Sequence, residues 1–292
     1  MVTDTSSQKK ISFFATTETE CPVCKTAHKK EELFSGGGRL VAGKLTSELR
    51  RTYLENKKFG KVYPLAYVVQ VCPGCLYAAY PRDFNNISMD EVQAIKGSTE
   101  HRKKLISTLF NDLTFKDNRT LVHGVASMAL AVDCYHLRVS KIAPTPKKAV
   151  SAIRAAWLFD DLFQEVSYRP YDKARDFYYM EAVKNYAKTL ELMQNGQEPV
   201  EQENYILGPD LDHNWAYDGI IYLNAFLTKK YLDQLAVDKP GKYKLLESAK
   251  RYLSKLYGMG KSSKSKPSII IDISKELYDE IGKMMAELEP PA

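Results

Sequence analysis

The chain has 292 residues, enough for one large domain or two of ordinary size. Its 44% apolar and 27% charged residues are typical of a globular protein and exclude wholesale disorder. The net charge of +6 is concentrated towards the N-terminus, where residues 1–84 carry 13 Lys and Arg against 8 Asp and Glu. No run approaches the roughly 18 apolar residues of a membrane helix. The short apolar run 11–15 is too short for a signal peptide, so the sequence predicts a cytoplasmic protein.

Four of the five cysteines form two Cys-Pro-x-Cys units, made by Cys21 with Cys24 and by Cys72 with Cys75. Two intervening residues let both sulfurs of a unit face one ion from a tight turn, and proline favours that turn by fixing its own φ. Four thiolates suit tetrahedral zinc and leave it no open position for a substrate. The sequence therefore predicts one structural zinc ion held by these four cysteines, in a reducing compartment rather than in disulfides.

Alternatives to this site are few. Each unit could act as a redox dithiol, although no thioredoxin-like βαβ pattern surrounds either one. His28 follows Cys24 by four residues and could replace a cysteine as ligand; with four cysteines available, we expect it at the surface. Cys134 lies within a helical apolar pattern and is predicted to be a small buried side chain.

Residues 1–84 are predicted to form a small β-rich domain that resembles a zinc ribbon. The run Ile11–Ala15 is expected to be an edge strand. The β-rich run Tyr63–Val71 leads into the second cysteine unit and Leu76–Tyr80 leads out of it, so a strand–turn–strand hairpin is expected there.

Helical periodicity begins at Ser88, which with Glu91 forms a capping box. Residues 85–143 are predicted to be connecting and capping helices. The next segment is expected to start a helix with Thr145 as N-cap and Pro146 in the first turn. A mainly helical domain is predicted over residues 144–292. Its helices are expected at 146–166, 171–195, 210–237, 242–257 and 272–288.

The helices after Thr145 carry a weak repeat signal. Trp215, Gly219 and Tyr222 occupy the positions that these residue types take in the first helix of a tetratricopeptide repeat. Ala182 and Tyr186 match the second helix. Since about three repeats are needed for a free-standing array, we expect the remaining helices to cap a tetratricopeptide-like stack of at most two degenerate repeats.

Taken together, the chain resembles a bacterial family known only as domain of unknown function 2225. The resemblance rests on the first cysteine unit, on the segment Val71–Ala79 around the second unit, and on Ala156-Trp157-Leu158. It implies a zinc-ribbon-like part followed by tetratricopeptide-like helices, and it implies no activity.

Three functional hypotheses follow. The leading one is an adaptor or scaffold whose helical groove binds a peptide or protein, with a partner site at Tyr168, Arg169, Tyr171 and Arg175. The alternative is a nucleic-acid-associated protein. Its phosphate contacts would come from basic residues of the N-terminal part: Lys44, Arg50, Arg51, Lys57, Lys58 and Lys61. The third is an enzyme, for which the sequence offers no catalytic motif; the adjacent Asp160 and Asp161 should face different directions on a helix.

Overall fold

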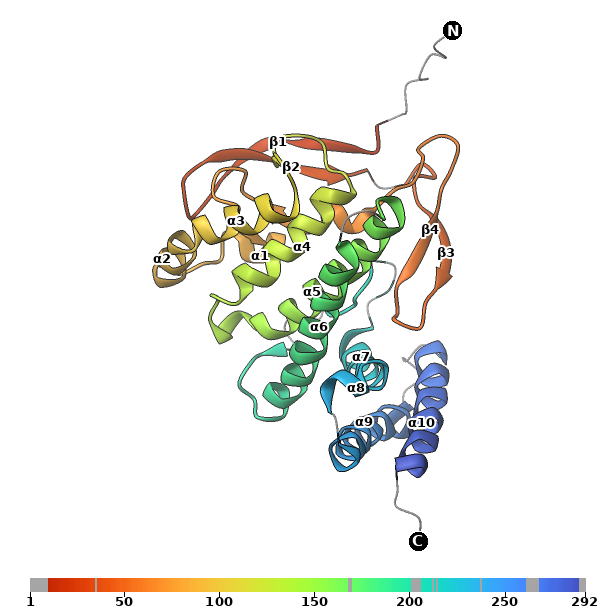
Figure 1. Cartoon of the computed structure of the whole chain (residues 1–292). Helices are drawn as coiled ribbons and strands as arrows, with labels where there is room; N and C mark the ends of the chain where they lie inside the picture. Colours follow the sequence, from red (N-terminus) through yellow and green to blue (C-terminus); the bar gives the residue numbers. More distant parts are fainter. Residues whose placement is uncertain are drawn as a thin grey trace.

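The protein is mainly helical, with small β-hairpins near its N-terminus (Figure 1). This computed structural model describes residues 10–34, 36–167, 170–200, 206–211, 213, 215–236, 238–260 and 268–288. The predicted class is confirmed at this level, while the tetratricopeptide-like array stays a prediction.

The β structure consists of three separate two-stranded antiparallel hairpins. They pair β1 (Ser12–Glu20) with β2 (Ala27–Leu33), β3 (Val41–Leu45) with β4 (Arg51–Leu54), and β5 (Gln70–Val71) with β6 (Ala78–Ala79). An isolated hairpin is marginal in water at best, so each needs support from the rest of the molecule.

One strand prediction is confirmed in part and another is wrong. The strand expected at Ile11–Ala15 is the first part of the longer β1. The run Tyr63–Val71 is mostly not a strand, because residues Pro64–Tyr67 form the 3-10 helix η1 and only its last two residues pair in β5. Pro64 stands in the first turn of η1, where its fixed φ and missing N–H favour a helical turn over a ladder.

The helices follow in chain order. They are α1 (Pro81–Phe84), α2 (Met89–Gly97), α3 (Thr99–Leu109), α4 (Leu121–Tyr135), the 3-10 turn η2 (Ser140–Ile142), α5 (Pro144–Glu165), α6 (Tyr171–Gln194), α7 (Ala216–Lys230), α8 (Leu232–Leu235), α9 (Lys239–Gly260) and α10 (Ser268–Leu288). The predicted capping box of α2 is confirmed, since the Glu91 N–H donates to Ser88 Oγ and the Ser88 N–H donates to Glu91 Oε2 at 2.8 Å.

The start of α5 differs from the predicted one. The helix begins at Pro144, and its N-cap is Ala143, whose φ of 47° is left-handed. Thr145 is not a cap, because its N–H and its hydroxyl donate to the Glu198 carboxylate at 3.0 and 2.7 Å. The Glu198 carboxylate, distant in the chain, therefore binds the Thr145 hydroxyl that would otherwise be free to cap the helix.

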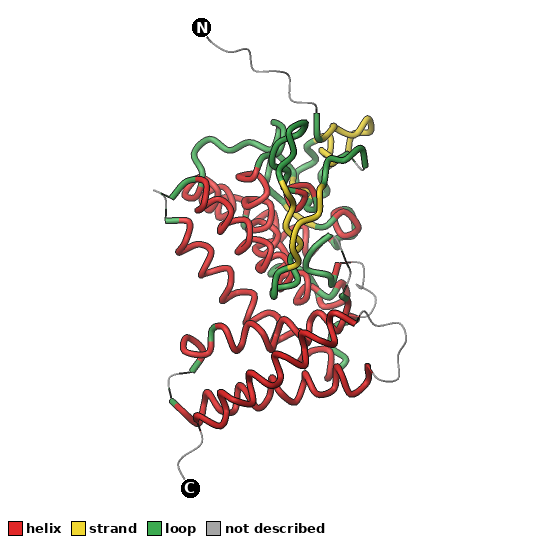
Figure 2. The backbone as a smooth tube through the Cα atoms, turned by 90° about the vertical axis from the view of Figure 1, so that its right-hand side faces the viewer, coloured by secondary structure: helices red, strands yellow, loops and turns green. Residues whose placement is uncertain are grey.

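The helices gather in two groups joined by one core. Helices α4, α5 and α6 lie side by side, and α7, α9 and α10 form a second group below them in Figure 1. In Figure 2 the strands lie in the half of the molecule that also holds the N-terminus, away from the C-terminus. A single cluster of buried side chains includes Cys72, Trp157, Tyr222 and Leu277. The core therefore runs without a break across residues 84/85 and 143/144, and the predicted domain boundaries stay predictions.

Candidate metal centre

Both cysteine units fold into the same kind of turn. In the first, between β1 and β2, the Cys21 N–H donates to Thr26 O at 3.0 Å and the Lys25 N–H donates to Cys21 O at 2.9 Å. In the second, between β5 and β6, Cys72 makes the same two bonds to the residues five and four positions further on, at 2.8 and 2.9 Å. The fourth residue after each leading cysteine, Lys25 or Leu76, is left-handed, with φ of 64° and 58°.

The two turns bring four sulfur atoms together. Cys21 Sγ lies 3.7 Å from Cys75 Sγ, and Cys24 Sγ lies 3.5 Å from Cys72 Sγ. All four sulfurs are within 4.8 Å of one another. A tetrahedron of sulfurs at ~2.3 Å from a zinc ion has edges of about 3.8 Å. The spacing therefore fits one tetrahedral metal ion, and four thiolates are ligands that zinc prefers.

Gly74 lets the two turns approach this closely. A Cβ at Gly74 would lie 2.5 Å from Thr26 Oγ1 and 3.4 Å from Cys24 Sγ, both on the opposite turn. The corresponding residue of the first turn is Val23, whose side chain is buried in the core. The third residue of the second cysteine unit must therefore be small, because it packs against the first turn, whereas the third residue of the first unit packs into the core.

Backbone N–H groups face the sulfurs and favour thiolates. The Gly74 N–H points at Cys72 Sγ with a distance of 3.4 Å. Hydrogen bonds from Cys21 and Cys75 lower the pKa of Cys72 to about 2, while the bond to Cys72 raises the pKa of Cys21 to about 12. A divalent cation that binds these cysteines as thiolates would displace the protons that the thiols still carry.

The second turn is anchored on α4. The Ala78 N–H donates to Cys134 Sγ at 3.4 Å, and the Tyr80 N–H donates to the Tyr135 hydroxyl at 3.0 Å. Cys134 is buried, as predicted, and lies outside the sulfur cluster. His28 is buried rather than at the surface, because its ring packs on Phe84.

Residues 14–281 match a family described as an uncharacterized protein conserved in bacteria (DUF2225). The chain belongs to this family. An uncharacterized protein of Borreliella burgdorferi is 40% identical over 281 residues, which cover 96% of this chain and 100% of that protein. No solved structure matches the chain. The family resemblance read from the cysteine units is confirmed, and neither description names an activity.

The sequence-based partner site is only partly described. Tyr168 and Arg169 lie outside the described residues. Tyr171 is buried, and its ring lies near those of Phe110 and Phe159. Arg175 binds Asp160 and Asp176 at 3.0 and 2.9 Å. These contacts give Tyr171 and Arg175 roles in packing, and a partner role for them stays a prediction.

The basic residues considered for nucleic acid divide into two groups. Arg50 donates to Asp161 and to Trp157 O of α5, and Lys61 binds Glu165 at 3.3 Å. Arg50 therefore attaches the β3–β4 hairpin to α5, and Lys61 attaches the segment that follows the hairpin. Arg51 donates to Gly43 O within the hairpin. Lys44, Lys57 and Lys58 have no carboxylate within ion-pair distance in the part of the chain that the structure describes.

The β3–β4 turn inserts against three helices, which no local sequence pattern indicates. The Glu48 carboxylate accepts hydrogen bonds from Trp157 Nε1 of α5, from the Tyr179 hydroxyl of α6 at 2.8 Å, and from Lys230 Nζ of α7 at 2.7 Å. Each partner is more than a hundred residues away along the chain. The turn is therefore a tertiary anchor of the hairpin.

Leu49 completes this anchor. It is 0% exposed and has a left-handed φ of 59°, a conformation that costs a leucine roughly 1 kcal/mol. Beside it is Gly219, whose Cβ would lie 3.7 Å from Leu49 Cδ1, and the Tyr222 hydroxyl donates to Ser47 O at 2.8 Å. Gly219 and Tyr222, two residues of the repeat signature, thus contact the hairpin turn.

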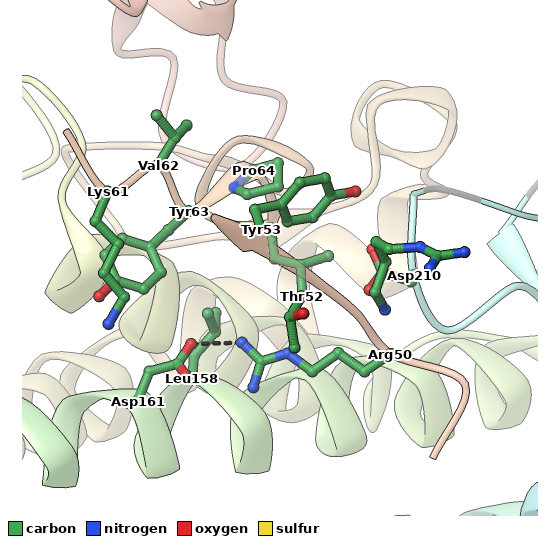
Figure 3. Close-up of a pocket in the computed structure, with 12 residues that line it drawn as sticks. Arg50, Thr52, Tyr53, Lys61, Val62, Tyr63, Pro64, Leu158, Asp161 and Asp210 are labelled. Atoms are coloured by element: carbon green, nitrogen blue, oxygen red, sulfur yellow. Dashed lines mark hydrogen bonds and ion pairs between the residues drawn. The ribbon is translucent and has the colours of Figure 1, made fainter. Parts of the chain in front are cut away.

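A small cavity lies along the seam between the hairpin and the helices. Figure 3 shows Arg50 reaching across it to Asp161. On its other side, Asp210 accepts the Arg51 N–H at 2.6 Å, and burial raises the pKa of Asp210. The cavity measures about 210 Å³, below the ~300–1,000 Å³ of ordinary ligand pockets. It is therefore better described as a packing seam than as a substrate site.

No helix in the described ranges is both long and apolar enough to cross a membrane.

Proposed function

We propose that the chain is a zinc-stabilised interaction protein of the adaptor or scaffold kind. The four cysteines hold a zinc ion that fixes the N-terminal hairpins on the helical body, and the hairpins present a surface to a protein partner. One observation carries this proposal, namely the gathering of exposed large apolar side chains on the hairpins and the loop between them: Phe13, Phe14, Leu40, Val41 and Leu54. Exposed apolar groups that gather in one region mark interaction sites.

The β3–β4 ladder provides the centre of this surface. Val41 and Leu54 are direct cross-strand partners and are 39% and 57% exposed. Since residues paired across a ladder lie on the same face, these side chains form one apolar face. Among the described residues no third strand pairs with this ladder, so the outer edge of β3 can accept an extended segment of a partner.

The helical groove expected from the repeat signature is the less accessible surface. On α5, α6 and α7 the turn of residues 46–50 already binds through Glu48 and Leu49. A partner peptide would have to displace this buried turn, so we assign the partner to the outer face of the hairpins.

Affinity capture with matched variants tests this assignment. The double substitution Val41→Ser with Leu54→Ser removes the apolar face while leaving buried residues in place. The control is Phe177→Ser on α6, which removes an equally exposed apolar side chain elsewhere, 58% exposed in the native chain. A protein retained by the native chain and by the control, and lost from the double variant, supports the proposal. Equal retention by all three contradicts it.

Nucleic-acid binding is the second candidate, favoured by the positive charge of this hairpin and of the residues that flank it. Residues 39–61 carry seven Lys and Arg against two Glu. Phosphate contacts make affinity fall steeply with salt. For this candidate we expect binding of single-stranded oligonucleotides that weakens from 50 to 200 mM salt and is reduced by Lys57→Glu with Lys58→Glu. The control Lys104→Glu, an exposed lysine of α3, should leave it unchanged.

A further inference from the structure

Arg102 of α3 is a buried cation beside the metal centre. Its side chain is 0% exposed, and its Nε and Nη2 donate to Cys75 O at 3.2 and 3.1 Å. Its other bonds go to the hydroxyls of Ser98 and Thr99. Every one of these acceptors is neutral, and no carboxylate of the described residues lies within ion-pair distance of Arg102.

The other buried cations nearby are compensated differently. Arg138 meets Glu91 at 2.8 Å, and Lys147 meets Asp83 at 2.7 Å. Arg154 binds carbonyl groups, but its charge acts on the nearby Asp210. A buried charge without an opposite charge is costly, because neutral hydrogen bonds replace only part of its hydration. The buried charge of Arg102 therefore needs a nearby negative charge, and the side chains that bind Arg102 do not supply one.

We propose that Arg102 is the counter-charge of the metal centre, an inference that rests on the proposed zinc site. Four thiolates and one divalent cation together carry a charge of −2, by simple summation of formal charges. The guanidinium lies against the carbonyl of one ligand residue, Cys75, and would offset one of these two charges. It also holds Cys75 in place, as outer residues of metal sites commonly do.

The two sides of the cluster support this assignment. Cys21, Cys72 and Cys75 are 0%, 0% and 3% exposed, so water cannot screen the negative charge at these three ligands. Cys24 alone of the four is partly exposed. Arg102 thus stands on the buried side, where a charged metal–thiolate group needs a cation most.

Zinc-dependent stability is the measurement that separates a counter-charge from ordinary packing. Zinc content and affinity of the native chain are measured first, the affinity by competition with a chromogenic chelator. Arg102→Met is expected to lower zinc affinity roughly 10–100-fold and to reduce the rise in melting temperature that zinc produces. The chelator-treated form of this variant should lose less stability than the zinc-bound form, because the metal-free cysteines carry less negative charge for the guanidinium to offset.

The second variant keeps the charge and changes the shape. Arg102→Lys should lose much less zinc affinity than Arg102→Met. If Arg102→Met does not fold, Arg102→Gln serves as the uncharged variant in its place. Equal losses for Lys and Met, or equal destabilisation with and without zinc, overturn the counter-charge. A native chain that binds no zinc overturns the zinc site and this inference together, whereas zinc binding that Arg102→Met leaves intact overturns this inference alone.

Cobalt substitution gives a spectroscopic check. Removing a positive charge near a thiolate raises the energy of its electrons, so the sulfur-to-cobalt charge-transfer band should move to longer wavelength in Arg102→Met. An unmoved band contradicts a nearby counter-charge. Ser98→Ala, which removes only a neutral contact of Arg102, should leave the band in place.

Discussion

Gly74 is the residue at which the two cysteine turns touch. Its missing side chain makes room for Thr26 Oγ1, which a Cβ would meet at 2.5 Å. We expect Gly74→Ala to push the turns apart and to weaken zinc binding, measured by chelator competition. Gly97→Ala is the matched control, because nothing lies within 4 Å of its added Cβ. Equal zinc affinity in the two variants would contradict this role for Gly74.

The charge of Glu91 makes the stability of the fold depend on pH. Burial alone would raise its pKa, but N–H groups of Ser88 and Val139 and the Arg138 guanidinium lower it from 4.5 to about 2. A carboxylate with a lowered pKa stabilises the fold above its unfolded pKa and loses that contribution as the pH falls through the folded value. Glu91→Gln should therefore reduce the free energy of unfolding by about 3 kcal/mol at pH 7.

The difference between this variant and the native chain should shrink as the pH falls from 4.5 towards 2. Denaturant unfolding at several pH values measures it. A constant difference across this window would show that Glu91 acts through packing and not through its charge.

At the scale of elements, the β3–β4 hairpin depends on its turn. Glu48 receives three donors from three helices, so Glu48→Gln should destabilise the protein by about 2 kcal/mol. Hydrogen exchange should show the loss of protection concentrated in residues 41–54. Glu55→Gln, at an exposed position of the same hairpin, should change neither quantity. Loss of protection spread evenly over all helices would contradict the anchor.

The elements also show what sequence reasoning could reach. The cysteine turns and the capping box at Ser88 are formed by residues at most five positions apart, so their spacing alone predicts them. Local spacing cannot predict the start of α5, because Thr145 bonds to the distant Glu198, nor the anchor at Glu48, because its partners lie on α5, α6 and α7. Contacts between residues so distant in the chain leave no periodic signal.

The sequence does not predict the burial of Arg102 either, because this burial also depends on contacts between residues distant in the chain. A single arginine in an amphipathic helix is ordinarily exposed. The second cysteine turn, which approaches α3, binds the Arg102 guanidinium through Cys75 O.

At the scale of the whole molecule, the core joins the cysteine turns to the helices. We expect Cys72→Ala to unfold the hairpins of residues 1–84 while most of the helical far-UV signal is kept, since the described residues up to Phe84 contain little helix. Exchange protection should also fall in α3 and α4, which contact the second turn through Arg102 and Cys134. Protection lost only within the hairpins would contradict a shared core.

The most direct test of the account is the metal content of the purified chain. Elemental analysis and native mass spectrometry should find one zinc ion per chain, lost in Cys72→Ser and retained in Cys134→Ala, whose cysteine lies outside the cluster. A native chain without bound metal, or zinc retained after Cys72→Ser, would contradict the four-cysteine zinc centre on which the proposed function rests.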